Sequence, residues 1–162
     1  MRAAAGLLIM LICSAWGFRR SLLLKRRCAL LKELRLLVEQ YSIEISCTAP
    51  TLEELARGSQ GEFGRLLREC SGSEPDIRRA WSSAVDRLSG QPGCGSEEIS
   101  LLLGLGRELG TCSAESQLAL LKLYSARFDK LISAAEKKAE QHGRMYRSGG
   151  VLAGLGAAVM LL

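Results

Sequence analysis

Both ends of this 162-residue chain are apolar, and basic residues stand just inside each apolar end. Residues 3–18 contain no charged side chain, and neither do residues 148–162. Because basic residues prefer the cytoplasmic side of a membrane, this layout predicts two membrane anchors, residues 1–20 and residues 148–162. The segment between them, residues 21–147, is then expected to be cytosolic, with both termini pointing away from the cytosol.

The residues that flank the predicted anchors have the chemistry of a membrane interface. Basic side chains near a bilayer attract anionic lipid headgroups by roughly 1 kcal/mol each, and tyrosine is enriched at the same level. The predicted membrane-flanking residues are Arg19, Arg20, Lys25, Arg26, Arg27, Arg144, Tyr146 and Arg147.

The two apolar runs are short for membrane spans. In helical form they extend about 24 Å and about 23 Å, against a hydrocarbon core of about 30 Å. Arginine side chains that reach the interface, together with local thinning of the bilayer, would cover the difference. A placement on the membrane surface, in which neither end crosses, remains the alternative.

The net charge of +5 is confined to these flanks. Residues 28–136 contain 12 basic and 16 acidic side chains, so the expected folded body is mildly acidic. A nucleic-acid-binding domain carries a basic stripe on its folded surface, and the charge distribution therefore argues against that class.

No constellation of residues in the sequence suggests catalysis or metal binding. The six cysteines stand at least fifteen positions apart, which favours small buried apolar residues over a zinc site or a disulfide framework. The one histidine, His142, lies in the basic juxtamembrane segment. Neighbouring glutamates, as in Glu97 and Glu98, do not face each other on a helix, and the helix dipole explains them. We expect no catalytic residue, metal ligand or cofactor, and no enzymatic activity; a hydrolase would need a converging polar pocket inside the bundle.

Helical periodicity extends over most of the middle segment. One apolar stripe predicts a first helix over residues 21–46, which Pro50 ends. Thr51 and Glu54 then form the pattern of a capping box, which predicts a short helix that ends at Gly58. A further short helix is expected over residues 62–69. The stripe of the first helix consists of Leu30, Leu34, Leu37, Tyr41 and Ile45.

The second half of the middle segment predicts three more helices. Pro75 suits the first turn of a helix that starts after Ser73 or Glu74 and ends at Leu88. Residues 89–95 are rich in glycine and proline and predict a loop. Ser96 is expected to cap the next helix, which stops at Gly110. In the predicted helix that ends at Leu88, the residues expected to be buried are Ile77, Trp81, Val85 and Leu88.

The last and longest helix is expected to begin at a Ser113 cap. Its apolar seam recurs in steps of three and four residues, as in a coiled coil. We therefore predict an all-α protein, an antiparallel six-helix bundle whose long first and last helices continue into N- and C-terminal transmembrane segments. The seam consists of Leu121, Tyr124, Phe128, Leu131 and Ala135.

Several local motifs resemble the stage III sporulation protein AB family. The most specific is the block from Arg144 to Ser148, Arg-Met-Tyr-Arg-Ser, which precedes a glycine-containing apolar tail. The others are Glu44-Ile45, the turn with Pro50 and Leu52, and the segment from Leu105 to Gly110 with Gln117 seven residues later. The chain departs from the family pattern at Ala49, Ser113, His142 and Gly149.

The resemblance implies a fold similar to the cytoplasmic domain of type II secretion inner-membrane platform proteins. It implies a role in the channel that joins the mother cell and the forespore during endospore formation, in the outer forespore membrane with the bundle in the mother-cell cytosol. The implied partners are the cognate secretion-type ATPase, other channel subunits and membrane lipid, with homo-oligomerisation left open. Candidate partner contacts are Arg107, Glu108 and Gln117. The alternative function is a membrane-surface helical regulator that binds anionic lipid through its basic flanks.

Overall fold

The protein is all-helical. The computed structural model describes the backbone of residues 2–48 and 50–161, and the side chains of residues 19–48 and 50–141. Six helices and no strand occur in these described residues, which confirms the all-α prediction. The helices are α1 (Arg2–Thr48), α2 (Leu52–Gly58), α3 (Gly61–Ser71), α4 (Ile77–Ser89), α5 (Ser96–Glu108) and α6 (Ala114–Leu161).

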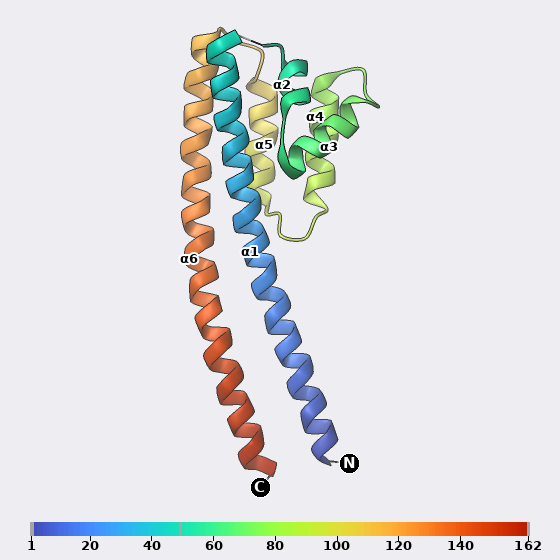
Figure 1. Cartoon of the computed structure of the whole chain (residues 1–162), viewed down its shortest axis with the longest axis vertical. Helices are drawn as coiled ribbons and strands as arrows, with labels where there is room; N and C mark the ends of the chain where they lie inside the picture. The colour runs from blue at the N-terminus through green and yellow to red at the C-terminus, as the bar shows by residue number, and fades with distance from the viewer. Residues whose placement is uncertain (1, 49, 162) are drawn as a thin grey trace.

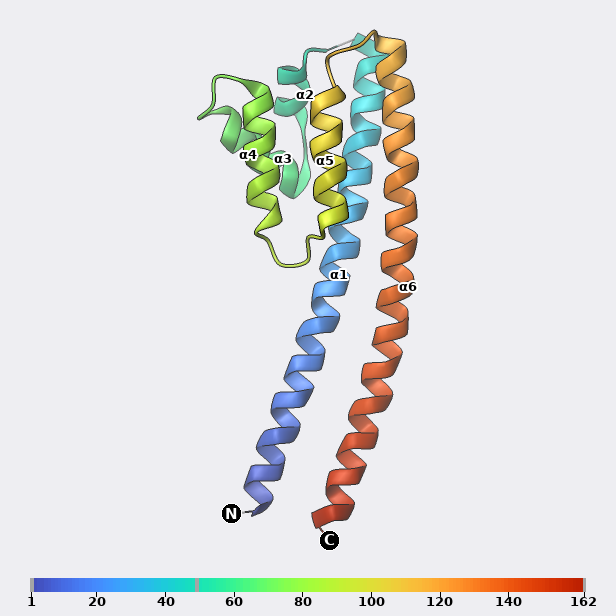
Figure 2. The ribbon, with the colours of Figure 1, turned by 180° about the vertical axis from the view of Figure 1, so that it is seen from behind.

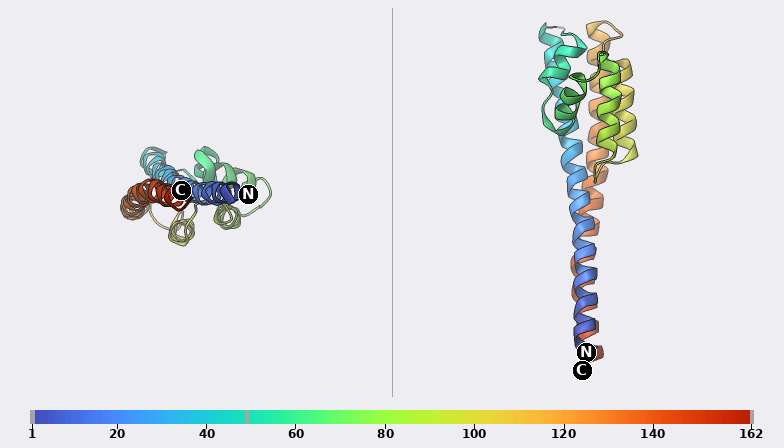
Figure 3. Two further views of the ribbon diagram at one scale, coloured as in Figure 1. Left: turned by 90° about the horizontal axis from the view of Figure 1, so that it is seen from below. Right: turned by 90° about the vertical axis from the view of Figure 1, so that its right-hand side faces the viewer.

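The two long helices, α1 and α6, run antiparallel along the whole molecule (Figure 1). Both chain ends therefore lie at one end of the molecule, as predicted. We call the opposite end, where α1 finishes and α6 begins, the distal end. The four short helices pack beside the distal half only, so the other half of the α1–α6 pair forms a stem (Figures 2 and 3).

No helix in the described part of the chain is long and apolar enough to cross a membrane. The side chains of the two predicted apolar runs, residues 3–18 and 148–162, lie outside the described residues.

The apolar stripes predicted for the long helices form the core. All five stripe residues predicted for the first helix are buried on α1. On α6, four of the five seam residues are buried, and Leu131 is half-buried at the edge of the core. Two ion pairs bridge the exposed edges of these helices: Arg35 with Asp129 at 3.0 Å, and Lys32 with Glu136 at 2.7 Å.

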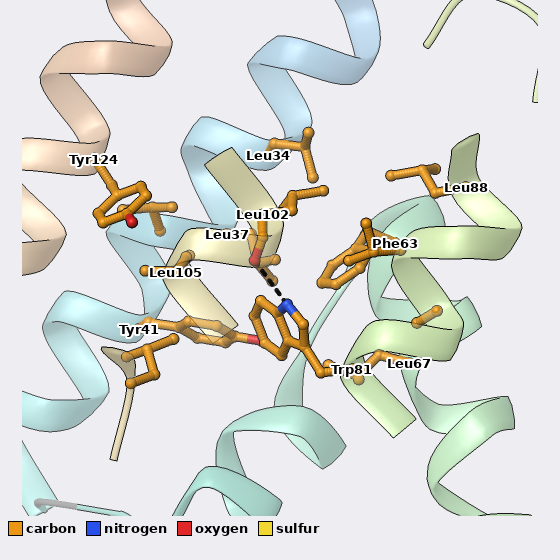
Figure 4. Packing of buried hydrophobic residues seen from close by; sticks show 14 of the residues in the cluster. Leu34, Leu37, Tyr41, Phe63, Leu67, Trp81, Leu88, Leu102, Leu105 and Tyr124 are labelled. Carbon is orange, nitrogen blue, oxygen red and sulfur yellow. Dashed lines mark hydrogen bonds between the residues drawn. The ribbon is translucent and has the colours of Figure 1, made fainter. Parts of the chain in front are cut away.

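Trp81 of α4 packs between the short helices and α1 (Figure 4). Its indole Nε1 donates a hydrogen bond to the carbonyl oxygen of Leu102 in α5 at 2.8 Å. The ring of Phe63 in α3 packs edge-on against it at a centroid distance of 5.0 Å, and the ring of Tyr41 in α1 lies 6.4 Å away. This side chain of α4 thus packs against or near three other helices, and a buried hydrogen bond fixes its orientation.

Gly106 makes this packing possible. A Cβ atom at this position of α5 would overlap the indole ring of Trp81. The residue is buried although it lies inside a helix, where glycine costs about 1 kcal/mol relative to alanine. The close approach of α5 to α4 therefore explains its presence.

Several predicted boundaries hold and others shift by a few residues. The capping box of α2 is confirmed, since Thr51 and Glu54 bond reciprocally. The start of α4 was predicted too early: Asp76 is the cap, because its carboxylate accepts the backbone N–H of Arg78 at 2.9 Å. Ser96 does not cap α5; Gly95 does, and Ser96 is already helical.

The cysteine prediction is only partly right among the described side chains. Cys70 is buried, whereas Cys28 and Cys94 are half-buried and burial raises the pKa of both thiols. Cys47 and Cys112 are exposed. These two stand at the distal end, at the last turn of α1 and in the turn before α6, where no other helix covers them.

Candidate functional site

The three candidate partner contacts flank the turn between α5 and α6 at the distal end: Arg107 and Glu108 end α5, and Gln117 lies in the first turns of α6. Leu109 is buried and anchors the turn, and Gly110 adopts a φ of 75°, a conformation that favours glycine. The Gln117 amide donates to the carbonyl oxygen of Cys112 at 2.8 Å, and the Ser113 carbonyl accepts the backbone N–H of Gln117 at 2.9 Å. Gln117 therefore closes the turn from the α6 side.

Glu108 lies on the other side of the same turn. Its carboxylate accepts the hydroxyl of Tyr124 at 3.3 Å. Burial, followed by the charge of Glu108, raises the pKa of Tyr124, and the guanidinium of Arg127 lies 5.5 Å from the centre of the same ring. Glu108 is thus exposed but already bonded within the chain.

Arg107 is the most available of the three candidates. Its side chain is exposed, and it forms no ion pair with any described residue. Its carbonyl oxygen accepts the guanidinium of Arg78 from α4 at 3.1 Å, which holds the end of α5 in place. The structure therefore brings Arg107, Glu108 and Gln117 to the two sides of one turn, and of these three only Arg107 presents a charged group without a described partner.

The predicted membrane-flanking residues divide into three groups. Arg19, Arg20, Lys25 and Arg26 are exposed on the stem part of α1. The side chains of Arg144, Tyr146 and Arg147 fall outside the described residues. Arg27 alone is built into the fold.

Arg27 pairs with the first turn of α5. Its Nε donates to Glu98 Oε1 at 2.5 Å, and its Nη2 donates to Glu97 Oε2 at 3.0 Å. The hydrogen bond to Glu98 raises the pKa of Arg27, although burial acts in the opposite direction. Glu98 is fully buried, and its Oε2 has no hydrogen-bond partner among the described residues.

Sequence reasoning missed this pair because local explanations were sufficient for each residue. Arg27 fitted a basic flank, and Glu98 fitted the helix dipole. A signal did exist: Glu98 stands four residues before Leu102, which is three before Leu105, so the carboxylate lies on the core-facing stripe of α5. A buried acidic residue at such a position needs a cationic partner.

Two hollows lie beside these residues. The first, of about 400 Å³, opens between α1, the loop before α5, and Lys138 of α6. The second, of about 510 Å³, is a groove between α5 and α6 lined by Leu101, Tyr124, Arg127 and others. The described residues contain no group of three or more histidine, cysteine or acidic side chains placed to hold a metal ion.

A family model for stage III sporulation protein AB matches residues 2–162, which is nearly the whole chain. The chain belongs to the stage III sporulation protein AB family. The resemblance expected from the local motifs is thereby confirmed, and membership implies a sporulation protein. No curated protein and no solved structure gives a significant match.

Proposed function

We propose that this protein is a non-enzymatic platform subunit of the secretion-like channel between mother cell and forespore, and that it docks a cytosolic ATPase. The observation that carries the proposal is the family match over residues 2–162, on a fold that brings both chain ends to one end of the molecule. Such a fold suits a tethered domain whose two tethers enter the same membrane.

The charge distribution is consistent with a membrane next to the end of the molecule where the termini lie. Arg19, Arg20, Lys25 and Arg26 are exposed on the stem and would face anionic headgroups. The apolar runs beyond them, within residues 1–20 and 148–162, would supply the anchors. Basic flanks of this kind favour the cytosolic side for the bundle, here the mother-cell side of the outer forespore membrane.

The distal end is the part of the bundle that a cytosolic partner reaches most easily. From residue 20 to Thr48, α1 would extend about 42 Å from the membrane. The C-terminal end of α5, which carries Arg107, lies toward that far end. We propose that the ATPase docks there, and that the α1–α6 pair passes the motion of the ATPase to the channel subunits in the membrane.

Binding of the full chain, reconstituted in lipid nanodiscs, to the purified cognate ATPase tests this proposal. Arg107→Glu reverses the uncommitted charge at the distal turn and is expected to weaken binding about tenfold or more, since it replaces attraction with repulsion. The matched control is Arg79→Glu, an exposed arginine of α4 that forms no ion pair with a described residue. Equal effects of the two variants, or no binding by the native chain, would contradict the docking site.

The exposed basic residues of the stem also favour a second candidate, a membrane-surface helical regulator. In that case the flanks bind anionic lipid and neither end crosses the bilayer. The two candidates differ in the location of the chain termini, which labelling from each side of the membrane distinguishes.

A further inference from the structure

The hollow of about 400 Å³ lies where the stem meets the short helices. Arg20, Leu23, Leu24 and Arg27 of α1 form one wall, and Lys138 of α6 stands opposite. The loop segment 93–95 closes the third side. Residues far apart in the sequence are therefore gathered around one space, whose size is within the range of small-molecule sites.

Two glycines allow the loop to pack closely against α1. Gly93 has a φ of 103°, and a Cβ atom there would lie 3.2 Å from the Cβ of Arg26 and 3.3 Å from the carbonyl oxygen of Leu23. A Cβ atom at Gly95 would lie 2.5 Å from Glu98 Oε2 and 2.9 Å from the guanidinium of Arg27. The loop backbone thus packs directly on α1, and the shape of the hollow depends on the folded bundle.

The charges around the hollow are not balanced. Arg27 pairs with both Glu97 and Glu98, so these three side chains together carry a net charge of −1. Arg20 and Lys138 are exposed, and neither forms an ion pair with a described residue. The five side chains together carry a net charge of +1, and the two unpaired cations at the hollow can attract an anion with several acceptor oxygens.

The apolar part of the lining indicates which anion. Leu23 and Leu24 are half-buried and add an apolar surface beside the cations. A free phosphate uses only the cations, whereas a phosphoglyceride presents a phosphate joined to glycerol and acyl chains. Arg20 is also the last residue of the predicted anchor segment 1–20, so in the proposed membrane placement it would stand at the level of the headgroups.

We propose that this hollow binds the phosphate of one anionic phospholipid headgroup. The proposal rests on the proposed function in one respect, because it presupposes that this end of the bundle faces a membrane. Arg20 and Lys138 pair with the phosphate oxygens, and the two leucines contact the glycerol region. The site differs from general attraction to the basic flanks because it needs α6 and the loop before α5 as well as α1.

The test uses the full chain in an uncharged detergent, with soluble dihexanoyl phosphatidylglycerol as the probe and calorimetry as the readout. Arg20→Gln with Lys138→Gln removes the two free cations and is expected to weaken binding about thirtyfold. The matched control, Arg19→Gln with Lys137→Gln, removes the same charge at neighbouring positions outside the hollow and is expected to change binding less than threefold. Retention of binding by Arg20→Lys with Lys138→Arg would support the charge pairing.

Three results would overturn the site. Equal losses in the two glutamine variants would indicate diffuse electrostatic attraction. Inorganic phosphate that binds as tightly as the lipid probe would make free phosphate the ligand, and dihexanoyl phosphatidylcholine that binds equally would remove the anionic requirement. The measurement contains no ATPase, so its failure is distinct from a failure of ATPase docking. Unchanged circular dichroism confirms that each variant is folded.

Discussion

Arg27 of α1 donates a hydrogen bond of 2.5 Å to the fully buried carboxylate of Glu98, 71 positions later in the chain. This contact ties the first turn of α5 to the point where the short helices begin to cover α1. The contact lies near the boundary between the folded bundle and the stem, where α1 and α6 have no short helix beside them.

Loss of the Arg27 guanidinium is expected to destabilise the bundle more than loss of an exposed ion pair. Arg27→Met leaves the Glu98 carboxylate buried without its partner, at a cost of about 3 kcal/mol in the free energy of unfolding. Urea unfolding of the full chain in a mild detergent, followed by circular dichroism, measures the difference.

The matched control is Arg35→Met, which removes exposed pairs with Asp129 and Glu39 and should cost at most about 1 kcal/mol. Adding Glu98→Leu to Arg27→Met is expected to restore most of the lost stability, because the unpaired charge is then gone. If Arg27→Met were no more harmful than Arg35→Met, the buried pair would contribute no more to stability than an exposed one.

Gly106 is expected to tolerate no side chain. Gly106→Ala places a methyl group against the indole of Trp81, and overpacking of this kind costs about 1–3 kcal/mol. Gly72→Ala is the control, since its added Cβ would lie 3.6 Å from the carbonyl oxygen of Glu69, an ordinary contact, and its φ of −73° suits any residue. Its effect should stay within about 0.5 kcal/mol. The same urea unfolding experiment compares them, and equal stability of the two variants would refute the close approach of α5 to α4.

The folded protein is expected to lose stability in alkaline solution because the hydroxyl of Tyr41 is buried. Its hydroxyl shares a buried hydrogen bond with Ser59 Oγ at 2.5 Å, and burial raises its pKa well above the ordinary value. The folded state therefore keeps the proton at a pH where the unfolded chain has released it. Stability from this group is complete below about pH 10 and falls above it, by about 1.4 kcal/mol per pH unit until the folded-state pKa is reached.

Tyr41→Phe removes this titration, so its unfolding free energy should decline less steeply above about pH 10 than that of the native chain. At neutral pH the variant should be less stable by about 1 kcal/mol, because Ser59 loses a partner. Urea unfolding on both sides of that pH separates the two effects. Parallel pH profiles for the native chain and the variant would contradict the raised pKa of Tyr41.

Much of the fold could be predicted because its determinants are local. The stripe from Leu30 to Ile45 has helical spacing, and Pro50 followed by the Thr51 capping box fixes the first break. The antiparallel arrangement of α1 and α6 followed from the apolar runs at both ends. None of these inferences needed knowledge of which short helix contacts which.

The contacts between distant segments could not be predicted in the same way. The hollow beside Arg20 depends on a loop that packs closely on α1 because two of its residues are glycines. The role of Gly106 depends on the position of Trp81. Periodicity indicates which face of a helix is buried but not what covers it. The three distal candidates could be placed near one turn from sequence, whereas the bond between Glu108 and Tyr124 needed the structure.

In the proposed topology both chain ends enter a membrane and the distal end faces the cytosol. Labelling with a membrane-impermeant maleimide, in inverted and right-side-out membrane vesicles, measures this topology. Cys47 and Cys112 are exposed distal thiols and serve as natural reporters, and Leu162→Cys in a background without other cysteines reports the C-terminus. Cys47 and Cys112 are expected to react only when the cytosolic face is accessible, and the cysteine at position 162 only from the opposite face. Reaction of position 162 from the cytosolic face would rule out the proposed topology.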